Sequence, residues 1–374
     1  MVAVTATLRV ACSPGEARIA VMENGELQDF AIWTPGHPDG VGDTHRGRIT
    51  SRVPALGGAF VTLGKGADGF LSDRDGAEGT CEGESVIVRV TRAAMAGKGP
   101  RLRAAPDAAP AKGDITLLKR GPSPLEELAA RWHGPILVDH PTFAARIPTS
   151  LRDRVKRVPS AWDDGVQDAV DTLTTPEIDL PGGMRATITP TPALVAIDMD
   201  SGSASAILQA KQTAQFAANR AAFPTLFRQI RLRNLSGAIL IDPAGLNARK
   251  RQALREPIEA ELRSDPLRPR CLGITALGLA EIVRTRIHPP LHELLSGAHG
   301  QAMQALRHLV TSHLIASQAT HRAGRPVLRA GLGVARALED DSLACEDVVS
   351  WCGYPLTLRA DPSMPFLSWV TDDE

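Results

Sequence analysis

Two apolar segments of this chain each lead into an aspartate, one ending at Asp198 and the other, residues 237–241, at Asp242. Between them, residues 206–223 have helical spacing, and we expect this helix to be interrupted at Pro224 and to resume after it. A strand, a helical crossover and a second strand form a β-α-β unit, in which the two strands run parallel. Ligand sites of such sheets lie beyond the carboxyl ends of the strands. If the two strands are neighbours, both carboxylates therefore emerge close together at one edge.

Two carboxylates placed so close together repel each other unless one is protonated or a cation lies between them. Oxygen ligands of this kind, with waters completing the shell, suit Mg²⁺. A bound Mg²⁺ can activate water and stabilise charge on a phosphodiester. Asp200, two residues after Asp198, is a further candidate ligand or a group that orients a water molecule. The alternative is that Asp198 and Asp242 only cap the turns that follow their strands, where aspartate is common.

The composition excludes several other classes of protein. With 374 residues the chain exceeds the usual size of one compact core, which predicts two or three domains. It contains no apolar stretch long enough to span a bilayer, and its first residues lack the basic segment and continuous apolar run of a secretory signal. The five cysteines are scattered and form no C-x-x-C pair, which favours a reduced cytoplasm over a disulfide framework or a thiolate zinc site.

The charged residues are unevenly distributed. The formal net charge is zero, whereas nucleic-acid binders usually carry a basic excess. Between residues 225 and 255, however, the only acid is Asp242, and five arginines there are candidates for neutralising phosphates: Arg228, Arg231, Arg233, Arg249 and Arg251. A second basic run comprises Arg89, Arg92, Lys98, Arg101 and Arg103. The alternative is that both clusters only form the solvated faces of helices and loops.

The first half of the chain has the pattern of short β-strands. Residues 17–33 alternate around Asn24-Gly25, which predicts a hairpin, and the glycine-punctuated runs that follow predict a small sandwich or barrel. Ser123 and Pro124 predict the start of a short helix. In the second half we expect a hairpin at 177–202, helices at 248–265 and 277–287, a strand at 269–275, and then a helix-strand-helix-strand pattern.

The residues around the two aspartates resemble the ribonuclease E/G family. The block ALVAIDMDSG (193–202) is similar to the family's first catalytic motif, and IRLRNLSGAILID (230–242) is similar to its second. The resemblance implies that Asp198 and Asp242 are the catalytic, metal-binding aspartates of the family. The family usually has an asparagine, which orients catalytic groups, at the position of Asp200, so this chain carries an extra carboxylate at a catalytic position.

The resemblance extends to the first half of the chain. Residues 39–75 resemble the family's RNA-binding OB-fold insertion, and residues 95–104 resemble the segment that closes it. The resemblance implies that Phe60, Phe70 and Lys98 contact RNA, because two phenylalanines and a lysine do so in the family. The residue types agree, since aromatic faces stack on bases without selecting a sequence and a cation follows the phosphates. For each phenylalanine taken alone, the alternative is packing in a core.

Two departures from the family mark this chain as a short form. The stretch that follows the family's catalytic domain, residues 288–303 here, has no cysteine, so we expect neither a zinc link nor another zinc site. The family's subdomain that senses a 5′-monophosphate end, with its Arg-Thr pair, has no counterpart between Arg103 and Gly134. We therefore expect little or no preference for 5′-monophosphorylated RNA.

The resemblance implies a multidomain fold of the α/β (α+β) class. The expected domains are an RNase H-like domain in two parts (1–38 and 133–182), an OB-fold barrel (39–105), a linker with a short helix (106–132), a DNase I-like catalytic domain (183–297) and a small C-terminal α/β domain (298–374).

The function that the resemblance implies is that of a cytoplasmic, metal-dependent endoribonuclease that acts in RNA processing or decay. With Mg²⁺, or Mn²⁺ in its place, it would hydrolyse single-stranded RNA to 5′-phosphate and 3′-hydroxyl ends. No membrane association is expected, and a homodimer is compatible with the family. The alternative is a non-catalytic RNA-binding protein that retains the ribonuclease E/G fold. A metal-dependent nuclease acting on DNA is a third interpretation, which the resemblance to an RNA-binding barrel disfavours.

Overall fold

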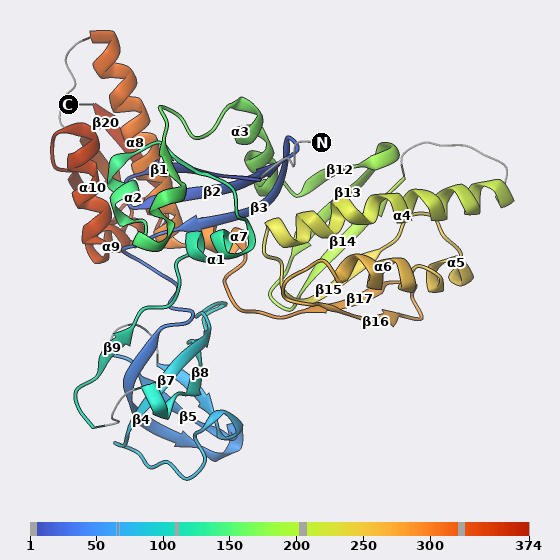
Figure 1. Cartoon of the computed structure of the whole chain (residues 1–374), viewed down its shortest axis with the longest axis horizontal. Coiled ribbons are helices and arrows are strands. Elements are labelled where there is room, and N and C mark those ends of the chain that lie inside the picture. The colour runs from blue at the N-terminus through green and yellow to red at the C-terminus, as the bar shows by residue number, and fades with distance from the viewer. Residues whose placement is uncertain are drawn as a thin grey trace. The chain divides into compact units, whose positions relative to one another are not determined.

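The chain folds into two compact units, each of which combines strands and helices (Figure 1). The computed structural model describes residues 6–373 apart from 65, 67, 109–111, 202–207 and 321–325. The first unit consists of residues 1–167 and 292–374, and the second of residues 168–291. The predicted mixed α/β class is confirmed, while the domain boundaries within it stay predictions. No helix in the described part of the chain is long and apolar enough to cross a membrane.

The first sheet of the first unit has five strands in the order β11-β10-β1-β2-β3. They are β1 (Thr7–Ser13), β2 (Glu16–Glu23), β3 (Glu26–Trp33), β10 (Ile136–Val138) and β11 (Val155–Arg157). The hairpin β2–β3 is the predicted one, and Asn24 and Gly25 both have positive φ, as a tight two-residue hairpin turn requires. Helix α1 (Pro124–Arg131) begins as predicted after Ser123, which exchanges capping hydrogen bonds with Glu126.

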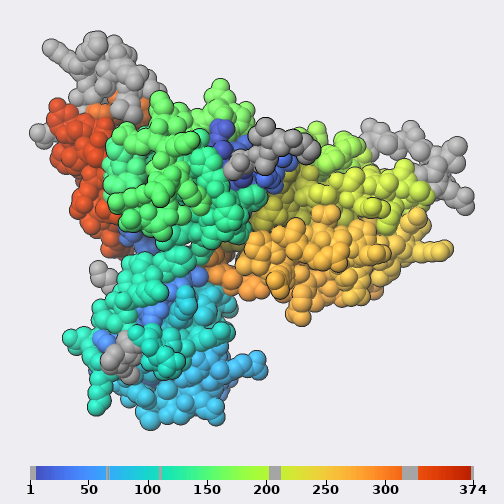
Figure 2. Space-filling view, in the orientation of Figure 1, coloured from blue at the N-terminus to red at the C-terminus, as the bar shows by residue number. Residues whose placement is uncertain are grey.

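A closed barrel is built from the next strands of the first unit. They are β4 (Thr44–Val53), β5 (Gly58–Thr62), β6 (Gly69–Ser72), β7 (Ser85–Arg92) and β8 (Arg101–Ala104). They pair in the order β5-β6-β8-β7-β4, and β4 also pairs with β5, which closes the ring. The predicted OB-like barrel is thus confirmed, and its blue-to-teal residues form one compact body (Figure 2). Its interior is filled by Ile49, Ala59, Val61, Leu71, Val88, Val90 and Leu102.

One further strand joins this barrel in the stretch 106–132, for which the sequence predicts only a linker and a short helix. β9 (Thr116–Lys119) pairs with β4 at the barrel's side. The expectation for residues 106–132 is corrected accordingly. The strand escaped prediction because its residues are mostly exposed, so they show no alternation of apolar and polar side chains. Residues 109–111 of the same stretch lie outside the described residues.

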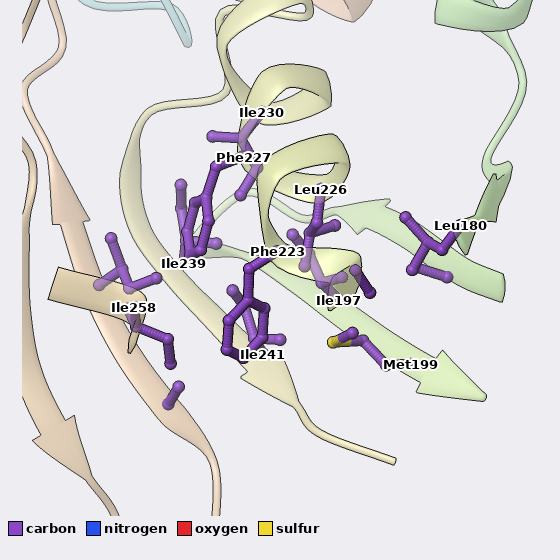
Figure 3. Close-up of a cluster of buried hydrophobic side chains, with 14 of the residues drawn as sticks. Leu180, Ile197, Met199, Phe223, Leu226, Phe227, Ile230, Ile239, Ile241 and Ile258 are labelled. Atoms are coloured by element: carbon purple, nitrogen blue, oxygen red, sulfur yellow. The ribbon is translucent and has the colours of Figure 1, made fainter. Parts of the chain in front are cut away.

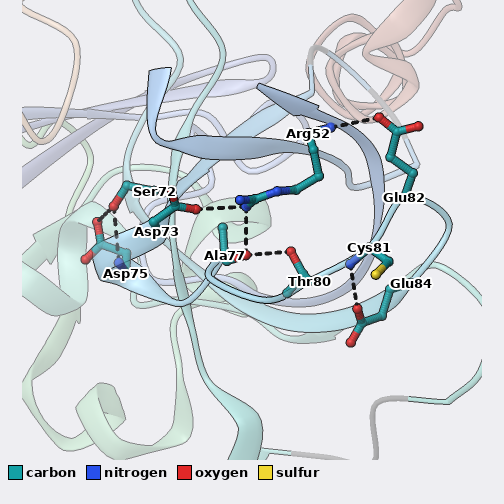
Figure 4. A network of polar contacts seen from close by, with 9 residues as sticks. All are labelled: Arg52, Ser72, Asp73, Asp75, Ala77, Thr80, Cys81, Glu82 and Glu84. Carbon is teal, nitrogen blue, oxygen red and sulfur yellow. Dashed lines mark hydrogen bonds and ion pairs between the residues drawn. The ribbon is translucent and has the colours of Figure 1, made fainter. Parts of the chain in front are cut away.

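A network of polar contacts holds the segment that follows β6 against β4 (Figure 4). The Arg52 guanidinium donates to Asp73 Oδ1 at 2.8 Å and to the Ala77 carbonyl at 2.7 Å. The Arg52 backbone N–H donates to the Glu82 carboxylate at 3.0 Å. Ser72, the last residue of β6, donates to Asp75 at 2.6 Å. These contacts fix the end of β6, which is the strand that carries Phe70.

The C-terminal residues of the first unit form a three-stranded sheet, β19-β18-β20, with helices packed on it. The elements are α8 (Ala298–Thr320), β18 (Pro326–Ala330), α9 (Leu332–Asp340), α10 (Ser342–Cys352), β19 (Thr357–Ala360) and β20 (Trp369–Asp373). The predicted helix-strand-helix-strand pattern is present, with α10 and β20 as additional elements.

The second unit is built on one six-stranded sheet in the order β12-β13-β14-β15-β17-β16. Its strands are β12 (Glu177–Leu180), β13 (Met184–Pro190), β14 (Leu194–Asp200), β15 (Gly237–Asp242), β16 (Arg270–Ile274) and β17 (Ala280–Arg284). The neighbours β14 and β15 are parallel, and the other neighbouring pairs are antiparallel. The predicted β-α-β unit is therefore confirmed, with its two strands adjacent.

The helices of the second unit cover one face of this sheet. They are α4 (Leu208–Leu232), α5 (Ala248–Gln252) and α6 (Arg255–Leu262). Figure 3 shows Phe223 of α4 beside Ile241, and Phe227 beside Ile239. The helix therefore runs antiparallel to β15, as a crossover between two parallel strands must.

The expected interruption of the helix at Pro224 is not found, because α4 continues through this residue. A proline removes one backbone hydrogen bond and crowds the preceding turn, which disfavours it inside a helix. Here the apolar residues on both sides of Pro224, namely Phe223, Leu226 and Phe227, are buried against the sheet. Tertiary packing therefore outweighs the local preference. Residues 206 and 207, at the start of the predicted helix, lie outside the described residues.

Of the other predicted helices, the one at 277–287 is wrong and the one at 248–265 is confirmed in part. The stretch 277–287 contains strand β17 instead of a helix, and its side chains alternate, with Ala280, Ile282 and Arg284 buried. The sequence of this stretch does not discriminate between helix and strand, because a short apolar run fits both the helical period and the strand period of side-chain positions. The single helix expected over residues 248–265 is divided into α5 and α6.

Candidate active site

Asp198 and Asp242 lie directly opposite each other on neighbouring parallel strands. The register of β14 and β15 pairs Leu194 with Ala238 and continues to Asp198 with Asp242. Adjacent strands are about 4.8 Å apart, and paired residues project from the same face. The predicted proximity of the two carboxylates is therefore found. Asp198 is exposed and 45% of the Asp242 side chain is exposed, so both can reach a ligand from solvent.

The two carboxylates point away from the helices of the second unit. Ile197 and Met199 alternate with Asp198 along β14, and both are buried in the core below α4 (Figure 3). Ile241 precedes Asp242 in β15 and is fully buried on the same side. Because successive side chains of a strand point to opposite faces, the aspartates project from the other face of the sheet.

Asp200 lies on the same face as Asp198 but does not complete a cluster of three acids. It follows Asp198 by two residues, and its register partner on β13 is Arg185. Among the described residues, no three His, Cys, Asp or Glu side chains are gathered closely enough to hold a metal ion. The pair Asp198 and Asp242 still fits Mg²⁺, which is commonly held by one or two carboxylates together with waters and substrate phosphates. Asp200 is thus a neighbour of the pair and not a third member.

Arg251, in α5, is bound to one of the two aspartates. Its Nη1 donates to Asp242 Oδ1 at 2.7 Å and to the Gly278 carbonyl at 3.0 Å, and its Nε donates to the Leu246 carbonyl at 3.0 Å. The Asp198 carboxylate, in contrast, makes no hydrogen bond or ion pair with the residues that the structure describes. The two carboxylates are therefore not equivalent: one is held by a cation of the chain and the other is not.

The loop that follows Asp242 is held by amide side chains of α4. Asn219 donates to the Ala244 carbonyl and accepts from the Ala244 N–H, both at 3.0 Å. Gln212 donates to the Gly245 carbonyl at 3.0 Å and accepts from the Asn247 N–H at 2.9 Å. These two side chains replace hydrogen bonds that the irregular backbone of residues 243–247 cannot make within a sheet or helix. The loop, and with it the end of β15, is fixed to α4.

We expect Asn219→Ala to lower the free energy of unfolding by about 2 kcal/mol, because it leaves the buried N–H and C=O of Ala244 without partners. Gln212→Ala provides the matched comparison, because Gln212 is half-exposed and water can replace its hydrogen bonds to the loop. This variant should lower the free energy of unfolding by less than about 1 kcal/mol. Urea unfolding of both variants measures the difference. Equal stability of Asn219→Ala and wild type would show that the loop is not held in this way.

The arginines that were predicted to contact phosphates fall into two groups. Arg249 and Arg251 lie in α5, which begins six residues after Asp242. Arg228, Arg231 and Arg233 lie at or just beyond the end of α4. Because α4 runs back from the carboxyl edge of β14 to the amino edge of β15, its end lies at the sheet edge opposite the aspartates. The structure therefore does not bring these three together with Asp198 and Asp242.

Arg233 is buried, with only 6% of its surface exposed. Its guanidinium donates to the carbonyls of Thr175 at 2.6 Å and Thr172 at 2.9 Å, and to the Gln229 side chain at 3.2 Å. Burial lowers the pKa of Arg233 from its usual value to about 10. These contacts tie the end of α4 to the segment before β12, so Arg233 has a structural role in this fold and we do not retain it as a phosphate contact.

Phe60 and Phe70 form an aromatic pair on the outer face of the barrel. They are register partners on β5 and β6, with their rings edge to face at a centroid distance of 5.5 Å. Both are half-buried, whereas their neighbours Ala59 and Leu71 fill the barrel interior. The guanidinium of Arg101, the partner of Phe70 on β8, lies over the Phe70 ring at 4.7 Å. Packing in the barrel core is thus excluded as the explanation for the two phenylalanines.

Lys98 lies in the exposed turn before β8, where it forms an isolated bridge with Met95. Arg101 belongs to the second basic run of the sequence, and nothing in that run relates it to the aromatic pair. The signal that could have found it is the three-residue spacing from Lys98 within the block KGPRL.

Comparisons with known proteins agree with the sequence motifs. Residues 140–287 match the model of the ribonuclease E/G family. The chain is 35% identical over 130 residues to ribonuclease E of Nostoc sp., an alignment that covers 34% of this chain and 19% of that protein. It is 24% identical over 387 residues to ribonuclease E of Escherichia coli K12, covering 74% of this chain and 36% of that protein.

The similarity to ribonuclease G is weaker in identity but longer. The chain is 22% identical over 486 residues to ribonuclease G of Escherichia coli K12, which covers 96% of this chain and 97% of that protein. By contrast, it spans less than a fifth of the length of the cyanobacterial ribonuclease E that it matches. The comparisons confirm the resemblance of this chain to the ribonuclease E/G family.

Proposed function

We propose that this protein is a metal-dependent endoribonuclease of the ribonuclease E/G type that hydrolyses single-stranded RNA. The observation that carries the proposal is the register of Asp198 with Asp242 at the carboxyl edge of two parallel strands. The relatives named ribonuclease E and ribonuclease G support RNA as the substrate. Action in RNA processing or decay, a cytoplasmic location and a homodimeric assembly, which the family resemblance implies, belong to the same proposal.

Asp198 and Asp242 would hold Mg²⁺, or Mn²⁺ in its place, through their carboxylate oxygens. The bound ion would supply a nucleophile from water and stabilise the charge that develops on the phosphodiester. Arg251 keeps the Asp242 carboxylate in a fixed orientation. We assign to Asp200, which lies on the same face of the sheet, the orientation of a water molecule for attack on phosphorus. The expected products carry 5′-phosphate and 3′-hydroxyl ends.

RNA binding is assigned to two regions of the chain. On the barrel, Phe60 and Phe70 would stack on bases, and Lys98 would contact the phosphate backbone. Near the aspartates, the exposed Arg249 of α5 would contact a phosphate. Arg228 and Arg231 are retained as contacts with a more distant part of the RNA, because they lie at the other edge of the sheet.

The proposal is tested by incubating the purified protein with single-stranded RNA and with single-stranded DNA of the same sequence, and by determining the end groups of any product. Internal cuts in RNA that leave 5′-phosphates, which a ligase or a 5′-phosphate-dependent exonuclease accepts, would support it. Cuts in DNA alone would favour the nuclease of the third interpretation. Tight RNA binding without cuts at any divalent metal concentration would make the protein the non-catalytic RNA-binding relative.

A further inference from the structure

The contacts of Arg251 bear on the choice of metal at the proposed site. We propose that Arg251 makes the Asp198 and Asp242 pair select Mg²⁺ over Ca²⁺, because it occupies one carboxylate oxygen of Asp242 and leaves the other for the cation. This inference rests on the proposed function. It adds a role for a residue whose place in a basic segment predicts a phosphate contact.

Three segments of the second unit hold Arg251 in place. Its Nη1 lies 2.7 Å from Asp242 Oδ1 at the end of β15, and its Nε lies 3.0 Å from the carbonyl of Leu246 in the loop held by α4. The same Nη1 also lies 3.0 Å from the carbonyl of Gly278, in the turn between β16 and β17. Only 19% of the Arg251 side chain is exposed. Nε and Nη1 of the guanidinium are therefore committed to protein acceptors.

The position of Arg251 also depends on a glycine. Gly278 has a φ of +91°, and a Cβ at this residue would lie 2.6 Å from Cδ and 2.7 Å from Nη1 of Arg251. In proteins a Cβ essentially never lies this close to a heavy atom to which it is not bonded. Any side chain at residue 278 would therefore displace Arg251. The absence of a side chain at Gly278 is what allows Arg251 to reach Asp242. The turn is closed by the Gly278 N–H, which donates to the Thr275 carbonyl at 2.9 Å.

This arrangement restricts how Asp242 can bind a cation. An arginine stays charged at any physiological pH and has no acceptor, so it holds Oδ1 of the carboxylate as a hydrogen-bond acceptor. Mg²⁺ requires near-octahedral geometry and usually takes one oxygen from each carboxylate. Ca²⁺ takes six to eight oxygens and gains from bidentate carboxylates. A carboxylate with one oxygen already engaged therefore suits Mg²⁺ and deprives Ca²⁺ of a ligand.

The test is calorimetric titration of Mg²⁺ and of Ca²⁺ into wild type, Arg251→Met and Arg251→Lys, without RNA. In Arg251→Met both oxygens of Asp242 become available, and the affinity for Ca²⁺ relative to Mg²⁺ should rise at least roughly tenfold, the effect of one charge-assisted hydrogen bond. Arg251→Lys keeps the positive charge but cannot span the same three acceptors. It should therefore show a smaller rise in the affinity for Ca²⁺ relative to Mg²⁺. The same titrations of Arg251→Lys test the inference if Arg251→Met does not fold.

The same titrations distinguish this inference from a second explanation of how Arg251 affects metal binding. If Arg251 acted only by repelling cations, Arg251→Met would bind both metals more tightly by the same factor, and Arg251→Lys would match wild type. That result, or an unchanged ratio in both variants, would overturn the inference while leaving the metal site itself in place. If wild type bound neither metal, or if Asp198→Asn bound both as tightly as wild type, the proposed function would fail, and this inference with it.

Discussion

Asp198→Asn should lower the rate of RNA cleavage by at least roughly 10³-fold, or about 4 kcal/mol of transition-state stabilisation, while RNA affinity changes little. The substitution preserves the shape of the side chain but removes the charge that holds the metal opposite Asp242. Affinity should persist because the aromatic pair on the barrel, which we assign to RNA binding, is unaffected. Single-turnover cleavage and filter binding measure the two quantities on the same preparation.

The matched control for this substitution is Asp179→Asn in β12 of the same sheet. The Asp179 side chain is 93% exposed, and its one ion pair within the described part of the chain is a long contact of 3.5 Å with Arg185, so its loss should leave cleavage and folding unchanged. If Asp198→Asn lost RNA binding and cleavage equally while its circular dichroism stayed normal, the assignment of Asp198 to the metal would be wrong. If it cleaved RNA at the wild-type rate, the proposed active site would have to lie elsewhere.

The second large effect is expected from the double variant Phe60→Ala/Phe70→Ala, which should weaken binding of single-stranded RNA by roughly 100-fold, or about 3 kcal/mol. Each ring offers a stacking surface for one base, and both lie on the outer face of the barrel, away from its buried interior. Fluorescence anisotropy with a labelled oligonucleotide measures the affinity. The loss should persist at high salt, because stacking depends less on salt than phosphate contacts do.

Leu56→Ala is the control for general loss of apolar surface on the same barrel. Leu56 is 61% exposed and lies between β4 and β5, so its removal should affect neither RNA binding nor stability by more than about 0.5 kcal/mol. An equal loss of affinity in Leu56→Ala and the double variant would point to an unspecific effect on the barrel. Unchanged affinity in the double variant, with the barrel folded, would remove the aromatic pair from the RNA-binding surface.

The proximity of the two aspartates could be predicted because it depends on short-range patterns. Two apolar strands joined by a helical crossover run parallel, and the position of each aspartate at its strand end then sets the edge at which both emerge. That the two strands are also neighbours is a result of the structure. The Asn24-Gly25 hairpin and the Ser123 cap were predictable for the same reason. In the hairpin and the cap, the residues that decide the structure are close together in the sequence.

The features that prediction missed depend on contacts between distant segments. Pro224 stays inside α4 because buried residues on both sides of it pack on the sheet, which local propensity does not register. Nothing near Arg251 in the sequence indicates that the Nη1 that contacts Asp242 also donates to the carbonyl of Gly278, because Gly278 belongs to a turn farther along the chain. The burial of Arg233 has the same origin, since two of its acceptors, the carbonyls of Thr172 and Thr175, belong to the segment before β12.

The most direct test of the central claim is cleavage of a labelled, AU-rich, single-stranded RNA with either Mg²⁺ or EDTA, by wild type and by Asp242→Asn. We predict internal cuts by wild type with Mg²⁺, and none with EDTA or in the variant, because Asp242 is one of the two paired carboxylates. Cuts that persist in EDTA, or in Asp242→Asn with Mg²⁺, would contradict a catalytic metal at this pair.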